Sequence, residues 1–136
     1  MWQSPGRLAL VLMMATAATS SPRAQGSTIL NGTWLFRTIT FNGNESADGH
    51  TSLLFSGNMY EQAVDGNVNE SGFVRLDQTK TPMTIDFIVS DGGPTQLGVI
   101  DVKGDVMRLH LNLGTTVRPV DFNPLPENLL IVANRK

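Results

Sequence analysis

Turn-forming residues divide the chain into short apolar runs at an even spacing, and this rhythm limits the folds open to it. From Thr33 onward, runs rich in Val, Ile, Leu, Phe and Thr alternate with Gly, Asn, Asp and Pro about every 8–12 residues. Beyond the N-terminal apolar segment, no stretch keeps the period of about 3.6 residues that an amphipathic helix requires. The sequence therefore predicts an all-β fold of antiparallel strands.

We expect about eight or nine strands, with Gly-rich or Asn-rich connections at 42–50, 65–72 and 90–96. A flat sheet of this size leaves two open edges, whereas an up-and-down barrel closes them, so a single small closed barrel is the economical arrangement. The expected strands are Thr33–Phe41, Thr51–Phe55, Met59–Val64, Gly72–Asp77, Thr84–Val89, Gln96–Val102, Asp105–Leu113, Val117–Phe122 and Leu129–Asn134.

The clearest hairpin lies in LGVIDVKGDVMRLHL. A two-residue turn at Lys103-Gly104 would place Ile100 opposite Met107 and Gly98 opposite Leu109. One face then carries apolar side chains and the other mostly polar ones, which indicates a sheet buried on one side. The apolar face holds Ile100, Val102, Met107, Leu109, Leu111 and Leu113, and the opposite face holds Val99, Asp101, Arg108, His110 and Asn112.

The first 26 residues have the layout of a secretory signal peptide and a short linker. Arg7 precedes an apolar run from Leu8 to Ala18, followed by small residues and then a polar stretch with proline. This run is too short for a membrane anchor, which needs about 20 apolar residues, and the early Pro-Gly pair disfavours a buried helix. We expect cleavage after Ala17, Ala18 or Ala24, and export to the periplasm or the extracellular space.

Residues 27–136 leave room for one domain. The net charge of -2 comes without a basic run, so nucleic acid is not an expected partner. The chain has no cysteine, hence neither a disulfide nor a thiol for a lipid anchor, and its stability must come from packing.

The stretch LNGTW opens the first expected strand. Gly32 permits a tight turn into the strand, and Trp34 is large enough to fill the narrow end of a barrel. A glycine two residues before a tryptophan is similar to the start of lipocalin-type barrels, in which an arginine near the chain's end often lies across the indole ring. Arg135 is therefore either such a stacking partner or a solvated terminal charge.

Four segments, LNGTW, RLDQTKTPMTIDF, LGVIDVKGDVMRLHL and VRPVDF, together resemble a family of small secreted lipocalin-like domains that is numerous in planctomycete bacteria. The resemblance runs from Leu30 to Arg135. It implies a calycin-like β-fold and small-molecule binding, and it supplies no catalytic residues. The chain departs from the family at Ile100, where tyrosine is common, and at His110, where cysteine is common. The matched positions are Leu76, Asp77, Lys80, Pro82, Ile85, Asp86, Gly98, Gly104, Asp105, Arg118, Pro119 and Phe122.

Large apolar side chains on the expected inner face are the candidates for a ligand cavity, although alternation does not distinguish a cavity wall from a filled core. Arg118 begins an expected strand, and we favour a structural ion pair with Asp86 or Asp121 over a ligand contact for it. If the barrel has a mouth, Arg118 is the first choice for a carboxylate or phosphate headgroup there. The apolar candidates are Phe36, Phe55, Phe87, Met107 and Leu109.

A possible reactive cluster comprises Asp86, Asp101, Arg108 and His110, which could hold an anion or move a proton. We favour a solvated outer face, because polar residues alternating with apolar ones are ordinary in a half-buried sheet. No nucleophile elbow, P-loop or dinucleotide motif is present, so we expect no enzyme and no cofactor.

A metal site is not expected either. The segment Asp65-x-Asn67-x-Asn69 begins like a calcium loop, but Glu70 replaces the glycine and Leu76 occupies the place of the final glutamate. The chain's two histidines, without cysteine, do not suggest a transition-metal site.

The sequence thus predicts an exported, monomeric, lipocalin-like barrel without a stable membrane anchor that binds a small apolar or amphipathic molecule. One alternative is a filled barrel whose loops contact a protein or an envelope component. A less favoured alternative is an enzyme.

Overall fold

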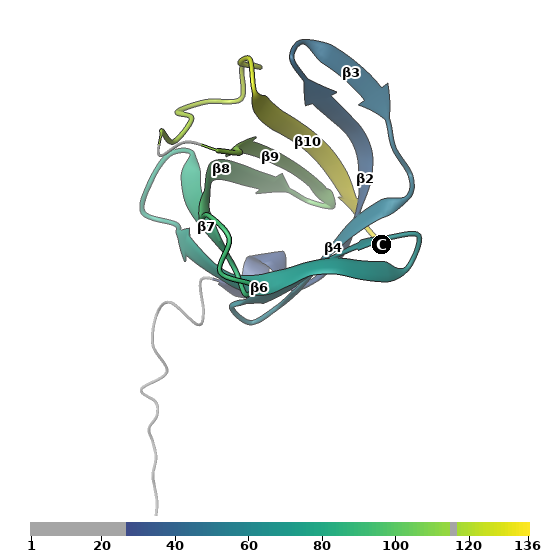
Figure 1. Cartoon of the computed structure of the whole chain (residues 1–136). Helices are drawn as coiled ribbons and strands as arrows, with labels where there is room; N and C mark the ends of the chain where they lie inside the picture. The colour runs from purple at the N-terminus through teal and green to yellow at the C-terminus, as the bar shows by residue number, and fades with distance from the viewer. Residues whose placement is uncertain (1–26, 115–116) are drawn as a thin grey trace, which may run out of the picture.

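The computed structural model describes residues 27–114 and 117–136, so the expected signal segment 1–26 lies outside the described residues. The described part holds a short 3-10 helix and a set of antiparallel strands (Figure 1). These elements are η1 (Ser27–Leu30), β2 (Gly32–Phe41), β3 (Asn44–Ala47), β4 (Thr51–Ser56), β5 (Met59–Val64), β6 (Asn67–Asp77), β7 (Met83–Val89), β8 (Gln96–Lys103), β9 (Val106–Asn112) and β10 (Asn128–Arg135).

The strands form a closed barrel. β2 pairs with β4, each strand from β4 onward pairs with the next, and β10 returns to pair with β2. This closes eight strands into a ring, while β3 pairs only with the second half of β2. Closure gives every strand of the ring two neighbours, so among the described strands only β3, outside the ring, is an edge strand. The all-β, up-and-down antiparallel barrel predicted from the sequence is confirmed.

Polar residues extend the sheet where the sequence predicted connections. β3 lies inside the expected loop 42–50, and the first half of β6 lies inside the expected turn 65–72. The turn itself shrinks to Asp65-Gly66, both with positive φ. Asn, Glu and Ser disfavour strands intrinsically, but backbone pairing with β5 and β2 overrides that preference here.

The expected strand at 117–122 is wrong. This segment has no strand pairing and follows the outside of the barrel between β9 and β10. Pro119 cannot donate to a ladder, and the segment is fixed by side-chain contacts instead. We call residues 117–122 the outer strap.

The hairpin of β8 and β9 is present, but its predicted register is wrong. The turn is Gly104-Asp105, and Ile100 lies opposite Leu109 instead of Met107. Each residue of β8 therefore lies opposite the residue of β9 that is two positions further along the chain than predicted. Because side chains alternate with a period of two, the apolar and polar faces remain as predicted.

One end of the barrel is sealed by Trp34, which is completely buried. Its indole Nε1 donates a hydrogen bond to the Leu30 carbonyl at 2.8 Å, and the Arg135 guanidinium lies 4.2 Å above its ring. Arg135 also donates from Nη1 to the Asn31 carbonyl at 2.7 Å. Gly32 fits here because its φ is +119° and an added Cβ would lie 3.4 Å from Arg135 Nη1. The first and last strands are thus joined over the indole ring.

Replacing Trp34 with alanine should lower the free energy of unfolding by about 3–5 kcal/mol, because a buried aromatic side chain leaves a cavity. Urea unfolding followed by circular dichroism measures the change. Phe73→Ala removes an aromatic ring that is 48% exposed and should have a much smaller effect. Equal stabilities of the two variants would contradict the sealing role of Trp34.

Candidate functional site

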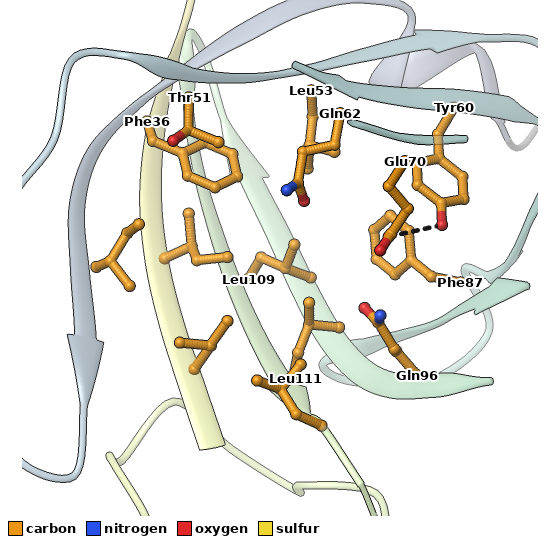
Figure 2. A pocket seen from close by; sticks show the side chains of 14 residues that line it. Phe36, Thr51, Leu53, Tyr60, Gln62, Glu70, Phe87, Gln96, Leu109 and Leu111 are labelled. Atoms are coloured by element: carbon orange, nitrogen blue, oxygen red, sulfur yellow. Dashed lines mark hydrogen bonds between the residues drawn. The ribbon is translucent and has the colours of Figure 1, made fainter. Parts of the chain in front are cut away.

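A cavity of about 260 Å³ lies inside the barrel (Figure 2), and Trp34 is not among the residues that line it. Its apolar lining comes largely from β2, β9 and β10 on one side, and its polar lining comes from β4, β5, β6 and β8. The cavity therefore has an apolar side and a polar side. The apolar residues are Phe36, Ile39, Leu53, Phe87, Leu109, Leu111, Leu113, Leu129 and Ile131, and the polar residues are Thr51, Tyr60, Gln62, Glu70 and Gln96.

The predicted apolar site residues divide between this cavity and the core. Phe36, Phe87 and Leu109 line the cavity. Phe55 and Met107 are buried in the core cluster and are not among the lining residues described. Phe55 lies opposite Gly32, nearer the sealed end. The structure thus brings three of the five apolar candidates together at one space.

The polar lining residues were missed by sequence reasoning. Gln62, Glu70 and Gln96 were not among the predicted site residues, and Glu70 lay in a segment predicted to be a turn. The sequence of β5 contained a usable signal. Tyr60 and Gln62 are two residues apart, so their side chains lie on the same, inward face, while Met59 is exposed on the other face. The alternation of side chains along a strand, applied to polar as well as apolar residues, thus identifies part of the polar lining of the cavity.

Tyr60 and Glu70 form the best defined contact of the polar wall. Tyr60 Oη donates a hydrogen bond to Glu70 Oε2 at 2.8 Å, and the Tyr60 ring meets Phe87 edge-on, with centroids 4.9 Å apart. Burial raises the pKa of the Tyr60 phenol, and its hydrogen bond to the Glu70 carboxylate raises that pKa further. At neutral pH, Tyr60 is thus a neutral donor and Glu70 its acceptor.

Arg118 lies on the outer face of the barrel, where it forms the favoured structural ion pair with Asp86 and not a headgroup site. Its Nη2 donates to Asp86 Oδ1 at 2.7 Å, and its Nη1 donates to the carbonyl of Gly98 at 2.9 Å and that of Ile85 at 3.1 Å. Asp86 also pairs with Arg75 at 3.2 Å. Arg118 therefore fastens the outer strap to β7 and β8, and it is not among the cavity-lining residues described.

The four residues of the possible reactive cluster separate into different contacts. Asp86 pairs with Arg118, and Asp101 pairs with Arg108, whose guanidinium lies 4.2 Å above the Phe122 ring. His110 is completely buried under the strap.

The His110 ring is bonded through both nitrogens. Its Nδ1 lies 2.6 Å from the Asp121 carbonyl oxygen, and its Nε2 lies 3.2 Å from Asn128 Nδ2. A neutral ring protonated on Nδ1 satisfies both contacts, donating to the carbonyl and accepting from the amide. The described contacts of His110 thus hold the strap and the start of β10 in place.

Comparisons with protein-family models, with curated proteins and with solved structures found no match for this chain. The closed eight-stranded antiparallel barrel is consistent with the calycin-type architecture that the sequence resemblance implied. In residues 27–114 and 117–136, no three His, Asp or Glu side chains gather as a metal site would require. Within the same ranges, no helix has the length and apolar character to span a membrane.

Tyr60 is the chain's only tyrosine, so its ionisation can be followed alone by phenolate absorbance. The raised pKa means that the folded protein keeps the phenol proton where the unfolded chain, with an ordinary value of 10.0, loses it. The absorbance midpoint should therefore lie above 10.0, and stability should fall as the pH rises above that value. Glu70→Gln should lower the midpoint, while a wild-type midpoint equal to that of the urea-unfolded chain would contradict this environment.

Arg118→Met should lower the free energy of unfolding by about 1–3 kcal/mol, because it removes charge-assisted hydrogen bonds and leaves two carbonyls without this donor. Arg37→Met is the matched control, since the exposed Arg37 side chain makes only a 3.3 Å hydrogen bond to Asn134 among the described residues. Urea denaturation gives both values. An equal, small effect of the two substitutions would show that the strap is not held by Arg118.

Proposed function

We propose that the protein is an exported, monomeric binding protein that holds a small, partly apolar molecule in its barrel and catalyses no reaction of its own. The observation that carries this proposal is the cavity of about 260 Å³ with an apolar and a polar side, beyond the sealing Trp34. Export rests on Arg7 and the short apolar run that follows it.

The size of the cavity limits the ligand. An apolar cavity of about 150 Å³ is enough to bind benzene. Pockets for drug-sized ligands begin at about 300 Å³. A cavity of about 260 Å³ therefore suits a molecule with one ring or a short branched chain, and a long acyl chain is too large to be enclosed.

The apolar and the polar side of the cavity have different roles in binding. Burial of apolar ligand surface against Phe36, Leu109 and Ile131 supplies affinity at roughly 25 cal/mol per Å² before the costs of association. Polar groups at Gln62 and Gln96 can fix the orientation of one polar end. An amphipathic molecule uses both walls, so it is the favoured class.

A second candidate function is an interaction module whose mouth loops contact a protein or an envelope component. Exposed apolar side chains on the segments around the barrel opening favour it. In that case, the cavity carries no resident ligand. The exposed residues in question are Phe41, Val64, Val68, Leu113 and Leu125.

Native mass spectrometry of the mature protein from its host's exported fraction distinguishes these functions. We expect a reproducible adduct that is lost when the protein is denatured. Leu111→Trp fills the cavity and should abolish the adduct, whereas Leu54→Trp on the exposed outer face of β4 should retain it. An unshifted mass that stays unshifted with a lipid and metabolite extract would contradict ligand binding and favour the interaction module.

A further inference from the structure

The cavity carries a negative charge. Among the described residues that line it, Glu70 is the only formally charged side chain at neutral pH, and neither lysine nor arginine is present. Glu70 pairs across β5 and β6 with Gln62, so both side chains project into the barrel. Figure 2 shows the Glu70 carboxylate close to Tyr60, with the amides of Gln62 and Gln96 directed into the same space.

The charge of Glu70 is not neutralised within the described part of the chain. Its carboxylate accepts a hydrogen bond from Tyr60, and no basic side chain of the described residues forms an ion pair with it. Tyr60 is neutral, so it satisfies one acceptor position and leaves the charge in place. A partly buried carboxylate without a counter-charge favours a cation beside it.

The neighbouring polar groups suit a cation with several donors. An ammonium group offers three N–H donors and no acceptor. Glu70 can accept one of them, and the amide oxygens of Gln62 and Gln96 can accept others. An anionic headgroup would meet the Glu70 carboxylate with no described basic residue in the cavity to offset the repulsion.

The segments around the barrel mouth have the same sign of charge. Residues 42–50, 65–66, 90–95, 113–114 and 123–127 contain acidic residues and neither lysine nor arginine. His50, in the first segment, is bonded to Asp65. An acidic rim raises the local concentration of cations and repels anions. The acidic residues are Glu45, Asp48, Asp65, Asp91 and Glu127.

We infer that the cavity selects a small cationic amphiphile, an amine whose ammonium group lies at Glu70 and whose apolar body packs against the β2, β9 and β10 wall. This inference rests on the proposed binding function and adds the charge class of the ligand. It also reverses the expectation of a carboxylate or phosphate headgroup, since Arg118 lies outside the cavity lining.

Three compounds with the same ring and different polar ends test the inference: phenethylamine, phenethyl alcohol and phenylacetate. Their binding to the purified mature protein is measured by isothermal titration calorimetry. We expect the amine to bind at least about tenfold more tightly than the alcohol, and phenylacetate to bind most weakly. This comparison needs only the wild-type protein.

Two matched variants then locate the source of the preference. Glu70→Gln removes the charge and keeps an acceptor for Tyr60, and it should bring amine binding close to that of the alcohol. Glu61→Gln makes the same chemical change on the exposed outer side of β5 and should preserve the wild-type preference. Near-ultraviolet circular dichroism confirms that each variant is folded.

The outcomes separate the two proposals. Equal binding of all three compounds would overturn the charge inference and leave the binding function intact. An amine preference that persists in folded Glu70→Gln would also overturn the role of Glu70. Failure of all three compounds to bind, together with an unshifted native mass, would overturn both the inference and the proposed function.

Discussion

The contact between Arg135 and Trp34 joins the two ends of the domain. The guanidinium covers the indole ring and also reaches the carbonyl of Asn31, so the last strand is bonded to the residues that precede the first. The contact lies where β10 pairs with β2, and this pairing closes the ring of strands. It therefore supports the closure of the whole barrel as well as the local structure around Trp34. Sealing one end with the largest side chain also confines open volume to the other end, where the cavity lies.

The outer face uses its ionisable groups to fasten the strap. Arg118, paired with Asp86, bonds the strap to backbone carbonyls of β7 and β8, and buried His110 bonds the Asp121 carbonyl. Residues that suggest chemistry in the sequence thus have structural partners, and the inward-facing polar residues become the better candidates for function.

The barrel could be predicted from the sequence, whereas the polar wall of its cavity could not. Alternation placed Phe36 and Leu109 inside, and a two-position error in the β8–β9 register left the faces unchanged. By contrast, Glu70 lay in a polar segment whose composition indicates a turn, and only its pairing with Gln62 on β5 places it in the barrel. For Arg118 the sequence favoured a structural ion pair with Asp86 or Asp121, which the contact with Asp86 confirms, over a headgroup at the barrel mouth.

The polar side chains that face into the barrel lower the stability of the fold, and the needs of folding alone do not explain their presence. Glu70 is partly buried beside Phe87 and Tyr60, and an apolar side chain at this position would avoid the partial desolvation of a carboxylate. Departures from the ordinary apolar interior are expected at functional sites, where stability is commonly lost in exchange for binding or activity. The rest of the cavity lining is apolar, so the departure is confined to β4, β5, β6 and β8. That local departure is the physical reason for assigning the polar end of the proposed ligand to this wall.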